Sequence, residues 1–203
     1  KTAYEIRNCD WSSDVCSSDL TTRELVDHHR DWVDAEFALN TDAGGGTLGP
    51  DGQARSYNIQ TGEKTYASYK VTTYNAGGHS SQPRADNAIY ELADALKRVQ
   101  AYRFPTMAND TTKAFFKAMA TTTPGELGTA MAAFSANPQD AAASDVLWNT
   151  PAYVGATRTT CVATMLRGGH AENALPQQAS ATVNCRIFPG VTPKQIEAEL
   201  RTV

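Results

Sequence analysis

The tripeptide Gly-Gly-His occurs twice in this chain, and each copy opens a dense polar segment. The first copy ends at His79 and runs into two serines, whereas the second, at 168–170, runs into Ala-Glu-Asn-Ala-Leu-Pro. Paired glycines allow a positive φ and the close approach of a ligand or a second chain. A histidine after such a turn lies on a loop, where function concentrates. The pattern therefore predicts a functional site at one or both segments.

Two residues have side chains that suit metal or acid–base chemistry. His79 is a candidate zinc ligand, general base or donor to a developing oxyanion, and the alternative is a histidine hydrogen-bonded within its own loop. Asp42 follows a short apolar stretch and precedes three glycines. It suits either a metal or substrate site at a strand end or the cap of a glycine turn. No His-Cys or His-Glu spacing builds a complete metal site within the chain.

Two further residues suit substrate binding. Asn173 precedes Ala-Leu-Pro, and its amide either donates to a substrate carbonyl or closes a turn. Arg186 lies on the polar face of an alternating segment. Its planar guanidinium suits either bidentate binding of a carboxylate or a cross-strand ion pair. The other three histidines, at 28, 29 and 170, are interpreted as surface or structural residues.

Residues 1–20 need separate treatment because they show neither helical nor strand periodicity and are rich in Ser and Asp. Residues 10–20 resemble the conceptual translation of a sequencing-library adapter, and residues 1–6 resemble that of the matching index primer, in one frame and in the correct order. The alternative is a disordered acidic tail. We interpret 1–20 as a non-native, adapter-derived segment and leave it out of the fold prediction.

The composition gives no indication of a nucleic-acid or membrane partner. The net charge of the 203 residues is −4, and it becomes −2 without residues 1–20, which hold two basic and four acidic residues. A weakly acidic chain gives no indication of binding to nucleic acid or an anionic membrane, and no apolar run approaches the length of a membrane span. Cys161 and Cys185 remain. One pair sets no disulfide framework and is compatible with either redox compartment, so no localisation is predicted.

Periodicity predicts the elements that would position these residues. Residues 21–32 are typical of a polar helix, 35–40 and 56–60 of short strands, and 64–74 of a half-buried strand. Pro83 and Asp86 signal the start of a helix. Its expected apolar face consists of Ile89, Leu92, Ala93, Leu96 and Val99.

The remainder of the chain predicts one insertion, two strands and a final helix. Residues 109–134 are Ala- and Thr-rich with helical stretches, and 154–166 and 179–188 read as strands. Thr192 is the expected N-cap of a helix with an apolar face of Ile196, Leu200 and Val203. From residue 64 the order is β-α-(insertion)-β-β-α. This is a ferredoxin-like split βαβ unit whose last strand is expected beyond residue 203.

Five ordered motifs between about residue 33 and residue 203 carry a resemblance to a known family. They are Ala-Leu-Asn-Thr-Asp-Ala-Gly-Gly-Gly (38–46), Gln-Thr-Gly-Glu-Lys (60–64), Gly-Gly-His-Ser-Ser (77–81), Asn-Ala-Ile-Tyr (87–90), and Gly-Gly-His-Ala-Glu-Asn-Ala-Leu-Pro (168–176) with Asn-Cys-Arg-Ile-Phe-Pro-Gly (184–190). Together they resemble the co-catalytic zinc exopeptidases of metallopeptidase family twenty. That family includes aminoacylase, acetylornithine deacetylase and glutamate carboxypeptidase.

The resemblance implies both a fold and residue roles. The implied fold is α+β, with a ferredoxin-like βαββα(β) lid, or dimerisation, domain over 64–203 that carries a helical insertion. A remnant of an α/β catalytic domain would precede it over 21–63. Asp42 resembles a terminal zinc ligand, and His79 the histidine that polarises the scissile carbonyl in a partner subunit's site. Asn173 resembles a residue that contacts substrate, and Arg186 the group that binds the substrate's free carboxylate.

The resemblance also implies an activity for a longer parent protein. That parent would hold two zinc ions and hydrolyse the amide bond of a small peptide or N-acyl amino acid next to a carboxylate, as a homodimer. However, the family's His-x-Asp motif and Glu-Glu pair are not found in 21–41, and a two-metal site needs its full ligand set. We therefore expect this chain to be inactive and to bind zinc weakly or not at all. The alternatives are a stand-alone ferredoxin-like dimerisation or binding module, and an unrelated α+β protein that uses His79 differently.

Overall fold

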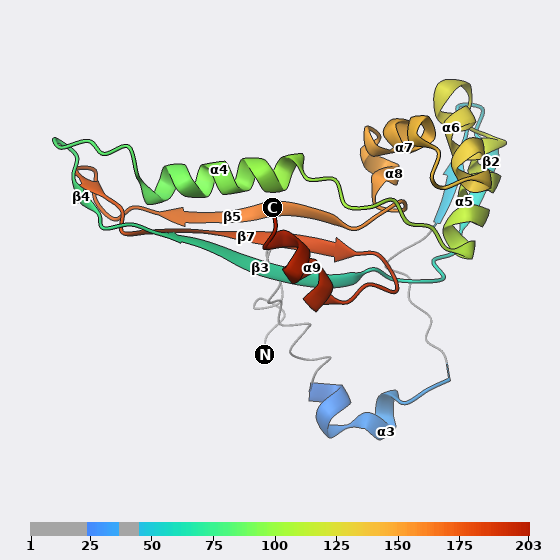
Figure 1. Cartoon of the computed structure of the whole chain (residues 1–203). Helices are drawn as coiled ribbons and strands as arrows, with labels where there is room; N and C mark the ends of the chain where they lie inside the picture. The colour runs from blue at the N-terminus through green and yellow to red at the C-terminus, as the bar shows by residue number, and fades with distance from the viewer. Residues whose placement is uncertain (1–23, 37–44) are drawn as a thin grey trace. The chain divides into compact units, whose positions relative to one another are not determined.

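A computed structural model describes residues 24–36 and 45–203 (Figure 1). The chain separates into two compact units, Lys1–Gly46 and Thr47–Val203. The described part of the first unit is helical at 24–28 and in α3 (Arg30–Val33), which confirms a helix in this region. Residues 35 and 36 are not in a strand, contrary to the prediction for 35–40. The rest of that segment, with Asp42 and residues 1–20, lies outside the described residues.

A three-stranded antiparallel sheet organises the second unit. Its strands are β3 (Thr65–Tyr74), β5 (Thr160–Gly168) and β7 (Gln178–Ile187). The spatial order is β3-β7-β5, so the strand that comes last in the chain lies in the middle. This order is that of a split βαβ unit and confirms the predicted α+β lid fold. Two smaller sheets pair β1 (Gly45–Leu48) with β2 (Ala54–Asn58), and β4 (Gly78–His79) with β6 (Ala174–Leu175).

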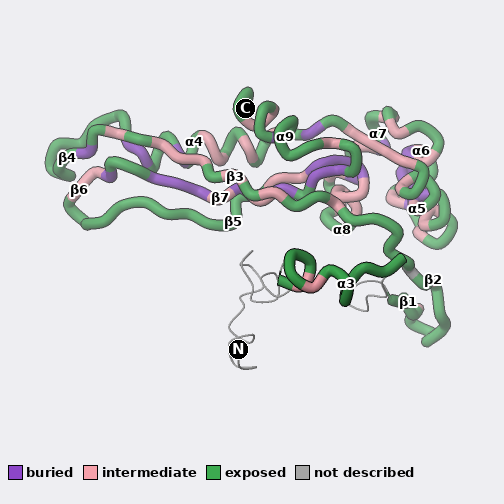
Figure 2. Tube along the Cα trace, turned by 90° about the horizontal axis from the view of Figure 1, so that it is seen from below, coloured by how far each residue is buried: buried purple, intermediate pink, exposed green. Residues whose placement is uncertain are grey.

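The main core lies between this sheet and two helices on one of its faces, α4 (Ala88–Ala101) and α9 (Pro193–Leu200) (Figures 1 and 2). Alternate residues of β7 are buried against them, as the alternating pattern of 179–188 predicts. These residues are Ala179, Ala181, Val183, Cys185 and Ile187. In α9, Ile196 is 1% exposed, and Thr192 and Gln195 form the capping box that stabilises its first turn.

The start and the buried face of α4 differ from the sequence prediction. The Asn87 side chain caps the helix by accepting from the Ile89 N–H at 2.8 Å, so neither Pro83 nor Asp86 begins it. Ala88 and Leu92 face the core, whereas Ile89 and Ala93 are exposed. The apolar face is therefore rotated by one residue toward Ala88 because the sheet, and not the largest side chains, determines which face is covered.

The helical insertion is longer than the predicted 109–134. It comprises α5 (Asp110–Ala120), α6 (Gly125–Ala136), α7 (Ala141–Trp148) and α8 (Pro151–Val154). These helices share a separate core of Phe116, Ala130, Met131, Phe134, Ala143 and Leu147. Because Val154 ends α8, the strand predicted over 154–166 begins only at Thr160. The predicted strand 56–60 likewise lies two residues earlier, as β2.

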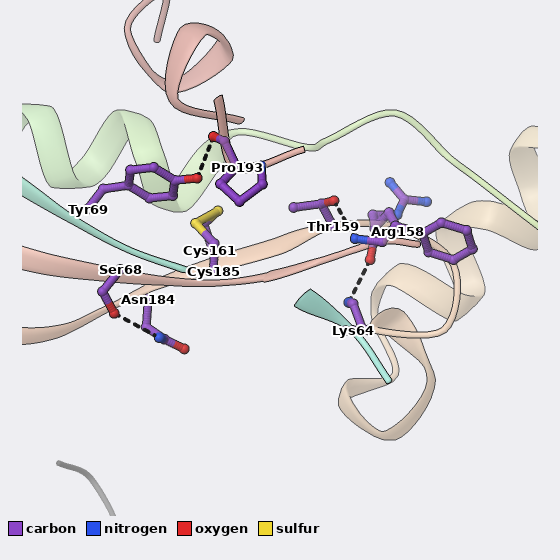
Figure 3. Close-up of a disulfide and its surroundings, with 10 residues drawn as sticks. Lys64, Ser68, Tyr69, Arg158, Thr159, Cys161, Asn184, Cys185 and Pro193 are labelled. Carbon is purple, nitrogen blue, oxygen red and sulfur yellow. Dashed lines mark hydrogen bonds between the residues drawn. A yellow bond between two sulfur atoms is a disulfide. The ribbon is translucent and has the colours of Figure 1, made fainter. Parts of the chain in front are cut away.

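The two cysteines of this unit form a disulfide, Cys161–Cys185 (Figure 3). They lie directly opposite each other on β5 and β7. Twenty-four positions of sequence separate them, so only the antiparallel register brings them together.

Candidate functional site

Both Gly-Gly-His segments lie at one end of the sheet, where β4 pairs with β6 (Figure 1). His79 is opposite Ala174, and the Ser80 N–H donates to the Asn173 carbonyl at 2.9 Å. We call residues 75–81 and 173–177 the ribbon. Gly77 has φ 75°, and a Cβ there would lie 2.8 Å from the Gln177 side chain. Glycine is therefore needed for the close approach that puts His79 beside Asn173.

The His79 ring is oriented by Ser81. Its Nδ1 lies 2.8 Å from Ser81 Oγ and accepts the Ser81 backbone N–H at 3.2 Å. Because Nδ1 accepts, these hydrogen bonds assign the neutral ring's proton to Nε2. The loop hydrogen bond expected as the alternative is thus present, but it occupies only Nδ1. His79 is exposed, and its Nε2–H has no partner in the described part of the chain, so it is free to donate to an external oxygen.

An ionic cluster that the sequence analysis did not predict stabilises the ribbon through hydrogen bonds. The Asp86 carboxylate accepts from Arg84 at 2.9 and 2.6 Å and from Asn75 Nδ2 at 3.0 Å. Asn75 Oδ1 in turn accepts the Gly77 N–H at 3.1 Å. Hydrogen bonds from Arg84, and then from Asn75, hold the pKa of Asp86 below its ordinary value. The carboxylate therefore ties together the two stems of the loop that carries His79.

Arg186 lies at the other end of the sheet. It is eight positions along β7 from Gln178, which is about 26 Å at strand spacing. Its cross-strand neighbours, Tyr66 and Thr160, carry no charge, and its Cζ lies 4.7 Å from the centre of the Tyr66 ring. The cross-strand ion pair is therefore not what the structure shows. Within one chain, Arg186 cannot share a small ligand with His79 and Asn173.

Lys64, which the sequence did not single out, lies in the electrostatic reach of Arg186. Its Nζ donates to the carbonyl of Arg158 at 2.9 Å (Figure 3). It also donates to the carbonyl of Gly155 at 2.9 Å, so it ties the start of β3 to the end of the insertion. Burial, and then the like charge of Arg186, lower the pKa of Lys64 to about 8. The sequence signals were its place at the end of the motif 60–64 and at the start of the predicted strand 64–74.

The described residues do not fit a two-metal centre. No group of three or more His, Cys, Asp or Glu side chains that could hold a metal ion occurs within 24–36 or 45–203. The predicted ligand Asp42 is outside those ranges. Over the same ranges, no helix has both the length and the apolar character to cross a membrane.

A family model described as the peptidase dimerisation domain matches residues 61–203, more than half of the chain. The chain belongs to this family. Its dimerisation domain thus contains His79, Asn173 and Arg186, whose roles remain predictions, as do the domain limits at residues 20 and 63.

Two curated relatives are each 29% identical to this chain, over 140 and 136 residues respectively. One is the N-fatty-acyl-amino acid synthase/hydrolase PM20D1 of Xenopus tropicalis, matched over 68% of this chain and 27% of the relative. The other is the probable carboxypeptidase S-like 2 of Dictyostelium discoideum, matched over 66% of this chain and 25% of the relative. The chain therefore spans about a quarter of the length of these relatives.

A solved structure also resembles the chain, the M20 family metallo-carboxypeptidase Sso-CP2 from Sulfolobus solfataricus. The TM-score is 0.45 at 16% identity, over 78% of this chain and 43% of that one.

Proposed function

We propose that this chain is the lid part of a metal-dependent exopeptidase or amidohydrolase that cleaves a peptide or N-acyl amide bond next to a carboxylate. Its membership in the peptidase dimerisation family supports this. So do the names of the two curated relatives, a fatty-acyl-amino acid hydrolase and a carboxypeptidase, because both names describe an amide bond beside a carboxylate.

The orientation of His79 carries the proposal. With Nδ1 occupied by Ser81, the exposed Nε2–H donates to the carbonyl oxygen as that oxygen gains negative charge in the transition state. Asn173, whose backbone is held beside His79, contacts the same substrate. Arg186 binds the substrate's free carboxylate through its guanidinium.

The distance of about 26 Å along β7 supports a site shared between two subunits, with His79 from one and Arg186 from the other. The contact between subunits runs through β5 and α4. The outer edge of β5 pairs with no strand in the described part of the chain, and an unpaired edge is a template for another strand. Val162 and Leu166 on β5 and Ile89 and Tyr90 on α4 are exposed apolar residues beside it.

The intact parent is proposed to hold two zinc ions, with Asp42 as one ligand. Because the described residues do not supply the remaining ligands, this chain alone is proposed to be inactive and to lack tightly bound zinc. The small-molecule substrate is a short peptide or an N-acyl amino acid.

The experiment that tests this function is complementation in the intact parent. His79→Ala should lower kcat about 100-fold or more without changing metal content. Arg186→Ala should mainly impair substrates with a free carboxylate. On a substrate with a free carboxylate, which both variants hydrolyse poorly, mixing them should restore about a quarter of wild-type activity, since half of the dimers would be mixed and each would hold one complete site. No recovery in mixed dimers would exclude the shared site, and loss of metal from His79→Ala would make His79 a ligand instead.

A stand-alone dimerisation module is the second candidate, favoured by the restriction of the family match to residues 61–203. The genomic sequence upstream of this reading frame separates the two. An uninterrupted frame that encodes His-x-Asp and Glu-Glu motifs supports the enzyme, and one that lacks both supports the module.

A further inference from the structure

The face of the sheet opposite α4 and α9 carries only positive charge. No Asp or Glu occurs in β3, β5 or β7, although the whole chain is acidic. Three cations occur there, Lys70, Arg167 and Arg186. Arg186 occupies an even-numbered position of β7, and Lys70 and Arg167 lie opposite even-numbered positions of that strand. The odd-numbered residues of β7 are buried in the core on the other face. Figure 3 shows this division, with Ser68 and Asn184 on the side away from Tyr69 and the disulfide.

A hollow of about 240 Å³ lies on this face between two of the cations. Lys70 on β3 is opposite Thr182, and Arg167 on β5 is opposite Ser180. The two cations therefore stand on the outer strands and flank a floor formed by two hydroxyl residues of the central strand. All four residues line the hollow.

Ser180 gives an independent sign of a ligand. It is only 9% exposed, and its hydroxyl has no hydrogen-bond partner among the described residues. Among the described residues, every side-chain polar atom that is fully enclosed has a hydrogen-bond partner. The unpartnered Ser180 hydroxyl is therefore not fully enclosed, and it opens into the hollow that Ser180 lines. A second hollow lies between α5, which supplies Lys113 and Lys117, and α6, which supplies Ser135. It differs in this respect because Ser135 Oγ already donates to the Lys113 carbonyl at 3.0 Å.

The polar side chains around the first hollow all donate. Ammonium and guanidinium groups have no acceptor, and the hydroxyls can donate to an anion. The ligand must therefore be an acceptor with negative charge, for which a carboxylate between an arginine, a lysine and two hydroxyls is suited. Arg186 lies four positions from Thr182, about 13 Å along β7, so the hollow is separate from the predicted substrate contact.

We propose that Lys70, Arg167, Ser180 and Thr182 form a carboxylate-binding site that holds an acidic side chain of an extended peptide running along this face. The spacing favours a peptide over a single free anion, because four extended residues span the same 13 Å or so to Arg186. A peptide with two carboxylates at this spacing engages both groups of cations. The site does not depend on hydrolysis.

The test uses the full 203-residue chain and the probe acetyl-Glu-Ala-Ala-Ala-Glu-amide, with its Gln-for-Glu counterpart as the control peptide. Binding is followed at low salt by calorimetry and by amide chemical shifts. The Glu peptide should bind and shift the Ser180 and Thr182 amides, and the Gln peptide should not. Failure of the Glu peptide to bind overturns the site.

Matched variants localise the binding. The pair Lys70→Met with Arg167→Met should weaken it at least tenfold. The pair Lys113→Met with Lys117→Met removes the same charge beside the other hollow and should change it less than twofold. Ser180→Ala, which leaves charge unchanged, should weaken it about threefold if the hydroxyl donates. Equal losses in both pairs would mean diffuse electrostatic attraction. Inorganic sulfate that binds these residues as tightly as the peptide would reduce the site to a general oxyanion contact, and either result overturns the proposal.

Discussion

The two ends of the three-stranded sheet are built in opposite ways. At the ribbon end, His79 and Asn173 are exposed and are held by polar contacts within two short loops. At the other end, Arg158 is only 3% exposed and connects three segments through hydrogen bonds to the Phe104 carbonyl and the hydroxyls of Thr106 and Ser144. One sheet therefore carries an exposed, polar loop at one end and a buried, hydrogen-bonded cluster around Arg158 at the other.

The buried end depends on a cation, Arg158, that forms no ion pair with a carboxylate within 24–36 or 45–203. Arg158 lies 5.0 Å from the Trp148 ring centre, and Arg103 lies 4.9 Å from the same ring. Burial, and then the charge of Arg103, lower the pKa of the Arg158 guanidinium. Carbonyl and hydroxyl acceptors and an aromatic face replace the water that Arg158 loses on folding.

The largest effect is expected at this buried end. Arg158→Met should reduce the free energy of unfolding by about 3 kcal/mol, because it leaves several acceptors without a donor. Urea unfolding followed by tryptophan fluorescence measures this. Arg103→Met is the control, since Arg103 contacts the same ring but lies in an exposed ion pair with Asp145, and should cost less than about 1 kcal/mol. Equal losses of unfolding free energy in the two variants would contradict the difference between the buried Arg158 and the exposed Arg103.

A smaller effect is expected from Lys64. Its pKa is about 8 in the folded chain and 10.5 ordinarily, so between these values the unfolded state holds more protons and stability rises with pH. Below pH 8 and above pH 10.5 both states carry the same charge on this residue. Solvent screening of this partly buried group limits the rise to about 1 kcal/mol. Unfolding measured across this window should show the rise, and Lys64→Met should abolish it.

At the ribbon end, Ser81→Ala should leave the free energy of unfolding within about 0.5 kcal/mol of wild type. It should nevertheless alter the His79 ring, because the Oγ contact to Nδ1 is lost. Nitrogen-15 chemical shifts of the imidazole report the share of the Nε2–H form, which should fall, and Ser81→Thr should restore it. An unchanged tautomer in Ser81→Ala would show that Ser81 does not orient His79.

The smallest effect on global stability is expected from Asp86. Its folded pKa is below the ordinary 3.8, so its contribution is complete above that value and is lost as pH falls toward the folded pKa. The protection factors of the amides in residues 75–81, which correct for the slower intrinsic exchange in acid, should therefore fall on acidification below about pH 4. Asp86→Asn should show faster exchange already at neutral pH, with the sheet core unaffected. Exchange that is independent of Asp86 would mean that the ribbon is held by β4–β6 pairing alone.

Features that depend on neighbours in the chain could be predicted from the sequence. Alternation predicted β3 and β7, Thr192 predicted the start of α9, and the ordered motifs predicted the family. These signals are local because strand alternation, helix periodicity and capping involve residues a few positions apart.

Only the tertiary structure decided which distant segments of the chain contact one another. The disulfide, the placement of Lys64 near Arg186, and the hollow between Lys70 and Arg167 all depend on the register of segments far apart in the sequence. The same register put His79 beside Asn173 and left Arg186 at the opposite end. Register is set by how the whole buried face packs, so a shift of one residue would reverse every strand face, and no local pattern specifies it.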